Sequence, residues 1–210
     1  MKLYYTETLN PRKVCAVARH LDVAVEFVRV DLTRGDTRTP AFLALNPNGK
    51  VPLLQDGDLC LWESNAIMCR LSDRASADLW PHDDRQIEVL RWLFWDASHF
   101  GRYAGRLYFE HIIKPAILGK TDPDAPAVAE ALDYFRTYAA ILDSHLADRR
   151  YVVGDSLTVA DFALAITLPY AEKARLPLAD FPAIARWHDR LNALPAWRDP
   201  FPAVPVLTTL

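Results

Sequence analysis

Glycine is scarce in this chain, and its seven residues make neither of the common phosphate-binding loops. Neither G-x-G-x-x-G nor G-x-x-x-x-G-K-S/T can be written from them. In those loops the backbone N–H groups cradle phosphates ahead of a helix. The sequence therefore excludes both nucleotide-binding signatures.

Cysteine is also rare, with three residues among 210. An odd number of cysteines in a chain too long to need disulfides favours free thiols and a reducing compartment. There is no C-x-x-C pair, and the six histidines lack metal-ligand spacing. We therefore expect no metal site.

A strong charge of either sign is missing, because 24 basic and 27 acidic residues leave a net charge of −3. A nucleic-acid-binding domain normally carries a basic surface, so we expect no nucleic-acid partner. No apolar run reaches 18 residues, and the first five residues lack the apolar core of a signal peptide. We expect no transmembrane helix, no membrane partner and a cytoplasmic protein.

The first 75 residues alternate between strand-like and helix-like patterns. Val14, Val17, Ala18 and Leu21 share one face of a helix, whereas Val25–Val30 alternates as a strand does. The full expected order is strand, helix, strand, helix, a hairpin of two strands, and helix. Its remaining members are a strand at Leu3–Tyr5, a helix at Thr39–Leu45, hairpin strands at Val51–Gln55 and Leu59–Trp62, and a helix from Ser64.

From about Gln86 the apolar spacing becomes purely helical, and prolines separate the runs. We therefore expect an α/β domain at residues 1–75, a charged linker at residues 76–85 and an all-helical domain at residues 86–210. The proline-rich tail, Pro195–Pro205, is expected to lie as a strap on the surface.

Three motifs carry a resemblance to a known family. Residues 46–54 read Asn-Pro-Asn-Gly-Lys-Val-Pro-Leu-Leu, and residues 63–67 read Glu-Ser-Asn-Ala-Ile. Residues 156–161 contain a capping box in which Thr158 begins a helix and Asp161 bonds back to it. In this order the motifs resemble the glutathione S-transferases, which implies a thioredoxin-like N-terminal domain followed by a helical C-terminal domain.

The resemblance also implies a glutathione-binding set. Ser64 at a helix N-terminus would bind the γ-glutamyl carboxylate, and Glu63 would hold the ammonium. Val51, ahead of a cis Pro52, would pair its backbone with the cysteinyl part, while Lys50 would reach the glycine carboxylate. Taken alone, Glu63 and Ser64 would be an ordinary helix cap, and Pro52 an ordinary trans proline at a strand entry.

Activation of the glutathione thiol is assigned to the turn after the first strand. Lowering a thiol pKa by about two units requires ~2.7 kcal/mol. Thr8 and Asn10 lie in a segment similar to the T-P-N-x-x-K-V pattern of nu-class-like bacterial members, except that Leu9 replaces the proline. We expect both to be catalytic. The alternative for Asn10 is a helix N-cap with Pro11 as the first helical residue.

The chain's own thiols are expected to take no part. Cys15 falls inside the first helix rather than at its start, and Cys15, Cys60 and Cys69 are expected to be buried apolar residues. Tyr4 and Tyr5 are expected to belong to the core or the sheet face.

An aromatic stripe suggests where a second substrate would bind. Trp92, Trp95, His99 and Tyr103 follow helical spacing. We assign Trp95, His99 and Tyr103 to a pocket for a hydrophobic electrophile. The alternative is that the stripe is ordinary helix packing.

Together these features predict a glutathione transferase that binds glutathione as co-substrate, without a cofactor, and adds its thiolate to a small hydrophobic electrophile in detoxification. The resemblance further implies a homodimer. Two alternatives remain: a glutathione-dependent disulfide-bond oxidoreductase, and a non-catalytic glutathione-binding protein.

Overall fold

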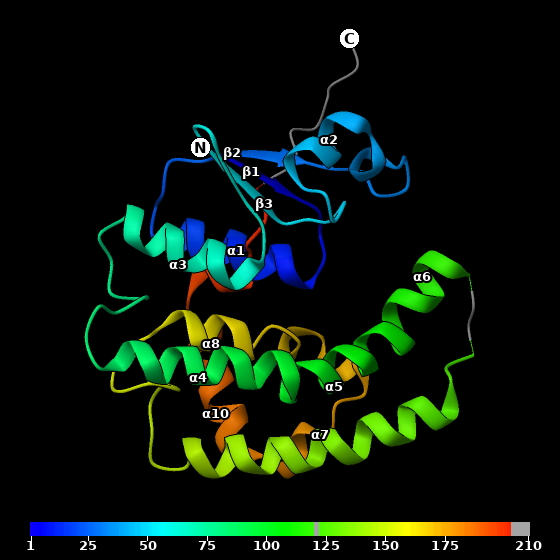
Figure 1. Cartoon of the computed structure of the whole chain (residues 1–210). Coiled ribbons are helices and arrows are strands. Elements are labelled where there is room, and N and C mark those ends of the chain that lie inside the picture. Colours follow the sequence, from blue (N-terminus) through cyan, green and yellow to red (C-terminus); the bar gives the residue numbers. More distant parts are fainter. Residues whose placement is uncertain (120–121, 203–210) are drawn as a thin grey trace. The chain divides into compact units, whose positions relative to one another are not determined.

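The computed structural model describes residues 1–119 and 122–202 and divides into two compact units (Figure 1). The first unit contains Met1–Ala75 together with the C-terminal segment from Leu194, and the second contains Ser76–Ala193. No helix in the described ranges is long and apolar enough to span a membrane.

A four-stranded mixed sheet organises the first unit, with the order β2-β1-β3-β4. β1 pairs parallel with β2 and antiparallel with β3, and β3 and β4 form an antiparallel hairpin. A parallel pair needs a crossover, which α1 (Leu9–His20) supplies between β1 and β2. The strands are Lys2–Tyr5, Glu26–Arg29, Leu53–Asp56 and Leu59–Leu61. The predicted order of strands and helices is confirmed.

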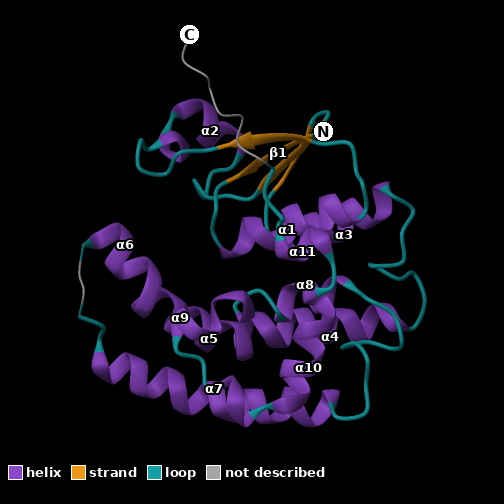
Figure 2. Ribbon diagram, turned by 180° about the vertical axis from the view of Figure 1, so that it is seen from behind, coloured by secondary structure: helices purple, strands orange, loops and turns teal. Residues whose placement is uncertain are grey.

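Helices cover both faces of this sheet. Figure 2 shows α1 beside α3 (Ser64–Arg74) on one face and α2 (Pro40–Leu45) on the other. On the α2 face, Phe42 packs into a buried cluster with Val30 and Leu53. A short 3₁₀ turn, η1 (Asp36–Arg38), precedes α2.

The two tyrosines of β1 take up the core positions expected of them. Tyr5 is buried, and the Tyr4 ring meets Phe42 edge-on, with 6.0 Å between ring centroids. The Tyr4 hydroxyl donates to Gln55 Oε1 at 3.2 Å. The Tyr4 side chain therefore connects β1 to α2 and β3.

The second unit is helical throughout. Its core contains the fully buried rings of Phe100, Phe135, Phe162 and Trp187. Its main helices are α4 (Arg85–Ser98), α5 (Phe100–Tyr108), α6 (Lys114–Leu118), α7 (Ala125–Leu146), α8 (Val159–Leu164), α9 (Ala171–Ala174) and α10 (Pro182–Asn192). Shorter turns are η2 (Phe109–Ile113, π-helical), η3 (Leu168–Tyr170) and η4 (Leu178–Asp180).

The predicted capping box at the start of α8 is confirmed. Asp161 Oδ2 accepts hydrogen bonds from the Thr158 backbone N–H at 2.9 Å and the Thr158 hydroxyl at 3.1 Å. Asp161 Oδ1 accepts from the Val152 N–H and from Trp187 Nε1, both at 2.9 Å. Burial raises the pKa of Asp161, and these four donors oppose that rise. One buried carboxylate thus joins a loop and two helices.

The expected linker and C-terminal boundary differ from the structure. Leu79, within residues 76–85, is buried, and its carbonyl accepts from the Val159 N–H at 2.9 Å, so this stretch belongs to the second unit. At the other end, α11 (Pro195–Arg198) packs on α1 in the first unit. The predicted helical domain at residues 86–210 included this segment; residues 203–210 lie outside the described part.

The tail segment is attached to α1 by side chains of that helix. Trp197 is fully buried, and its carbonyl accepts from Arg12 at 2.5 Å. Arg19 donates to the carbonyls of Asp199 and Phe201 at 2.5 and 2.8 Å. A proline-rich strap was predicted here, and its described part is a short helix with a buried tryptophan.

Replacing Asp161 with alanine should destabilise the second unit by about 3 kcal/mol or more, because its buried donors lose their acceptor. For a chain of this size that corresponds to a fall of roughly 6–12 °C in the melting temperature. Asp155→Ala, an exposed change in the preceding loop, is the control. Equal melting temperatures for the two variants in calorimetry would contradict this account.

Candidate functional site

A cavity of about 160 Å³ in the first unit gathers most of the predicted glutathione-binding residues. Three segments build it: the first turn of α1, the loop between α2 and β3, and the junction of β4 with α3. Its lining residues are Asn10, Asn46, Asn48, Lys50, Val51, Pro52, Trp62, Glu63 and Ser64.

The loop between α2 and β3 is shaped by the buried side chain of Asn46. Its Nδ2 donates to the Lys50 carbonyl at 2.7 Å, and its Oδ1 accepts from the Asn48 backbone N–H at 3.1 Å. Gly49 has φ +59°, and an added Cβ would lie 2.7 Å from Arg38 and 3.1 Å from the Thr37 carbonyl. Glycine is thus required at this position.

Val51 and Pro52 follow this turn and line the cavity. The peptide bond between the two is cis, as the resemblance implied. Pro52 is buried and directly precedes β3, the strand-entry position to which a residue without an N–H is suited.

At the opposite wall, α3 begins at Ser64, which is 7% exposed. Glu63 stands at the N-cap with φ +70°, a left-handed conformation that is uncommon outside glycine and is found at functional sites. The first-turn N–H groups of a helix have no intrahelical acceptor and carry a partial positive charge. A carboxylate is therefore favoured beside Ser64.

The structure of the first turn of α1 contradicts one of the two interpretations of Asn10, that it is the helix N-cap. The helix begins at Leu9 with Thr8 as N-cap, so Asn10 is the second helical residue and Pro11 the third. The N-cap alternative for Asn10 is wrong because Thr8 already has the extended backbone, φ −128° and ψ 173°, of that position. The exposed side chain of Asn10 instead receives a hydrogen bond at Oδ1 from the Ser64 hydroxyl at 3.4 Å.

Thr8 is adjacent to the cavity in sequence, although the described lining includes Asn10 and not Thr8. Within the described chain its hydroxyl makes no bond to the first turn of α1. The structure therefore brings together six of the seven residues predicted to bind or activate glutathione, and leaves Thr8 at the edge.

Two of the chain's three cysteines, Cys15 and Cys69, are unsuited to nucleophilic chemistry. Burial raises the pKa of the Cys15 and Cys69 thiols to about 12. Cys15 is fully buried as predicted, whereas Cys60 and Cys69 are half-buried. At neutral pH Cys15 and Cys69 are protonated, and a protonated thiol is a poor nucleophile.

The aromatic stripe packs against α7. Trp95 meets the Tyr138 ring edge-on at 5.9 Å, and His99 stacks on the same ring at 4.8 Å. Tyr103 stacks on Tyr134 at 4.6 Å. The helix is also interrupted, since α4 ends at Ser98 and α5 begins at Phe100. Helix packing, the alternative interpretation, accounts for these contacts.

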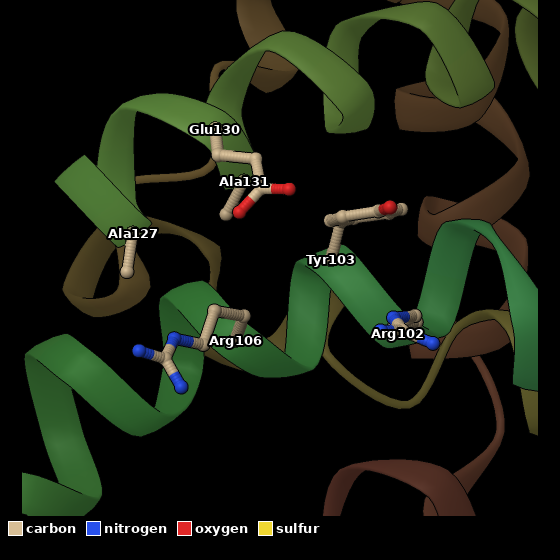
Figure 3. Close-up of a pocket in the computed structure, with 6 residues that line it drawn as sticks. All are labelled: Arg102, Tyr103, Arg106, Ala127, Glu130 and Ala131. Atoms are coloured by element: carbon tan, nitrogen blue, oxygen red, sulfur yellow. The ribbon is translucent and has the colours of Figure 1, made fainter.

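Tyr103 does line a second cavity, of about 410 Å³, between α5 and α7 (Figure 3). Figure 3 shows Tyr103, Arg102 and Arg106 on α5, with Ala127, Glu130 and Ala131 on the facing α7. These residues line the cavity. This cavity is charged rather than apolar, and Trp95 and His99 are not part of its lining, so the structure does not gather the three predicted electrophile-binding residues in one pocket.

Sequence reasoning missed three lining residues of the 160 Å³ cavity: Asn46, Asn48 and Trp62. Asn46 and Asn48 were visible as the polar ends of the Asn-Pro-Asn-Gly turn, where such side chains often bond to the nearby backbone. Trp62 was counted only as the end of a strand. Among residues 1–119 and 122–202, no three potential metal ligands come together.

Two family models match the chain. "Glutathione S-transferase, N-terminal domain" matches residues 1–71, and "Glutathione S-transferase, C-terminal domain" matches residues 103–195. Together they span more than half of the sequence.

Individual relatives agree with the models. "Glutathione S-transferase 3" of Zea mays is 33% identical over 96% of this chain and 94% of its own length. "Disulfide-bond oxidoreductase YfcG" of Escherichia coli is 27% identical over 92% of this chain and 91% of its own length. A solved structure of a possible glutathione S-transferase from Rhodopseudomonas palustris is 32% identical and has a TM-score of 0.84. The match covers 92% of this chain and 94% of that one.

These matches confirm the predicted fold class, a thioredoxin-like N-terminal domain with a four-stranded mixed sheet followed by a helical C-terminal domain. The chain belongs to the glutathione S-transferase family.

Proposed function

We propose that this chain is a glutathione transferase that binds glutathione in the 160 Å³ cavity and adds the thiolate to a small hydrophobic electrophile. The observation that carries this proposal is the convergence of a helix N-terminus, a lysine and the Asn10 amide on one cavity. Glutathione is then a co-substrate, and no further cofactor is needed.

The cavity offers a partner to each end of the tripeptide. Ser64 and the first-turn N–H groups of α3 suit the γ-glutamyl carboxylate, and Glu63 suits its ammonium. Lys50 is exposed at the rim and suits the glycine carboxylate. The Val51 backbone, between these ends in the lining, suits the cysteinyl part.

The thiol would lie near the first turn of α1. There the Asn10 amide and the Thr8 hydroxyl serve as hydrogen-bond donors to sulfur, and the helix N-terminus adds a positive field. Together these effects are of the order of the ~2.7 kcal/mol that a two-unit fall in pKa requires. The resulting thiolate forms a carbon–sulfur bond with the electrophile, whose leaving group departs with the displaced electron pair.

Glutathione-dependent disulfide reduction is the second candidate function. Its support is the similarity to the E. coli disulfide-bond oxidoreductase over 92% of this chain. The two activities separate in side-by-side rates with an aromatic halide and a mixed disulfide. A non-catalytic binding protein would bind glutathione without shifting the ultraviolet absorbance of its thiol toward that of the thiolate.

We also propose a cytoplasmic homodimer. All three cysteines are free thiols, and free thiols are typical of proteins in a reducing compartment such as the cytoplasm. Large exposed apolar side chains on two helices of the second unit support pairing with a second copy, because such side chains often mark interfaces. They are Ile87 and Phe94 of α4 and Tyr134 and Ile141 of α7, each at least 43% exposed.

Removing the Asn10 amide should weaken thiol activation. In Asn10→Ala we expect kcat/KM to fall roughly 10- to 100-fold, the equivalent of one hydrogen bond to a charged group. The apparent thiol pKa in the pH–rate profile should rise by about one unit or more. Thr8→Ser retains a hydroxyl and serves as the control, with near-normal rates. Unchanged turnover and pH profile in Asn10→Ala would remove this residue from the mechanism.

The thiol that reacts should be the ligand's alone. At pH 7.5 iodoacetamide should leave Cys15 and Cys69 unmodified in the folded protein and modify both in urea, since burial holds each pKa near 12. Mass spectrometry of peptides reads this directly. Loss of turnover in Cys15→Ala, with the melting temperature unchanged, would contradict the assignment.

A negative charge at Phe94 should separate the two subunits of the proposed dimer. Phe94, 69% exposed on α4, becomes costly to bury when changed to glutamate, so Phe94→Glu should run as a monomer in light-scattering chromatography. Leu32→Glu, on an exposed leucine of the first unit, is the control and should retain the mass of the unaltered protein. If the unaltered protein is itself monomeric, the homodimer is wrong.

A further inference from the structure

A buried lysine lies one helical turn beyond Asn10. Lys13 is 4% exposed and follows Asn10 by three residues in α1, so the two share a side of the helix. Lysine is almost never fully buried unless it is paired. Its position beside the proposed glutathione site therefore calls for a reason.

The Lys13 side chain reaches α3. Its Nζ donates to Asn65 Oδ1 at 2.7 Å, and Asn65 is the second residue of that helix. One residue earlier, the Ser64 hydroxyl donates to Asn10 Oδ1 at 3.4 Å. Two hydrogen bonds thus connect the first turn of α3 to one side of α1, and both involve residues next to or within the cavity lining.

The short bond is also the charged one. A hydrogen bond from an ammonium is roughly twice as strong as a bond between neutral groups, and at low exposure it is little screened. The Lys13–Asn65 bond therefore contributes more than the long Ser64–Asn10 bond to holding the first turn of α3 against α1.

We propose that Lys13 is a positioning residue for the γ-glutamyl end of glutathione, acting through Asn65 to hold the first turn of α3 and its Ser64 hydroxyl in register with Asn10. Lys13 is not in the described lining of the cavity, so it acts without touching the ligand. This inference rests on the proposed function, because it assumes that the cavity binds glutathione.

The proposal predicts that loss of Lys13 affects binding of one end of the ligand only. If Lys13 aligns only the γ-glutamyl subsite, its loss should affect glutathione and spare cysteinylglycine, which lacks that group. A general loss of structure would weaken both thiols alike. The ratio of kcat/KM for glutathione to that for cysteinylglycine is therefore the measurement that distinguishes the two.

In Lys13→Met, which retains length and removes the charge, this ratio should fall about tenfold. Asn65→Ala should lower the ratio as well, and the double variant should fall no further than Lys13→Met, because both substitutions break the same Lys13–Asn65 bond. Lys2→Met removes an exposed lysine of the same unit and should leave the ratio unchanged. Asn65→Ala carries the test if Lys13→Met does not fold.

Three results would overturn the inference: an unchanged ratio in Asn65→Ala, equal losses for both thiols, or additive losses in the double variant. Failure of the proposed function would look different. In that case the unaltered protein would show no thermal shift with millimolar glutathione, and no ratio would be measurable in any variant.

Discussion

The first unit depends on the packing of α1 against α3, which brings the first turns of two helices to one place. Each helix start carries unpaired N–H groups and a partial positive charge. Two helix N-termini close together favour an anion between them. Under the proposed function, the γ-glutamyl carboxylate of glutathione lies at one turn and its thiolate at the other.

The loop between α2 and β3 completes the cavity by fixing backbone rather than side chains. Asn46 bonds to both ends of the turn, and Gly49 takes a left-handed conformation where no side chain fits. As a result Lys50 and Val51 occupy defined positions although Lys50 is exposed. A ligand bound here meets a surface that is already formed, and little ordering is needed on binding.

Much of this could be predicted from local sequence, because the determinants are themselves local. The Thr158 capping box, the hairpin at Gly57 and the helix start at Ser64 each follow from residues within a few positions of one another. The contacts of Lys13 and Trp197 could not be predicted, since their partners lie 52 and 185 residues away, at Asn65 and Arg12. Helical spacing placed Trp95, His99 and Tyr103 on one stripe, but spacing does not say whether such a stripe faces a ligand or another helix.

The buried thiol of Cys15 and the exposed amide of Asn10 lie on the same helix in very different surroundings. A buried thiol in apolar surroundings is stabilised in its protonated form. The side chain of Cys15, on the buried side of α1, is therefore a poor nucleophile. The same helix presents the neutral amide of Asn10 at its positive end, where we propose that a thiolate brought by a ligand is stabilised. A protein thiol at that turn would compete with the ligand for the same donors. Under the proposed function, a buried Cys15 and an amide at the turn leave those donors to the substrate thiol, and this favours its transfer to an electrophile over chemistry that passes through a protein disulfide.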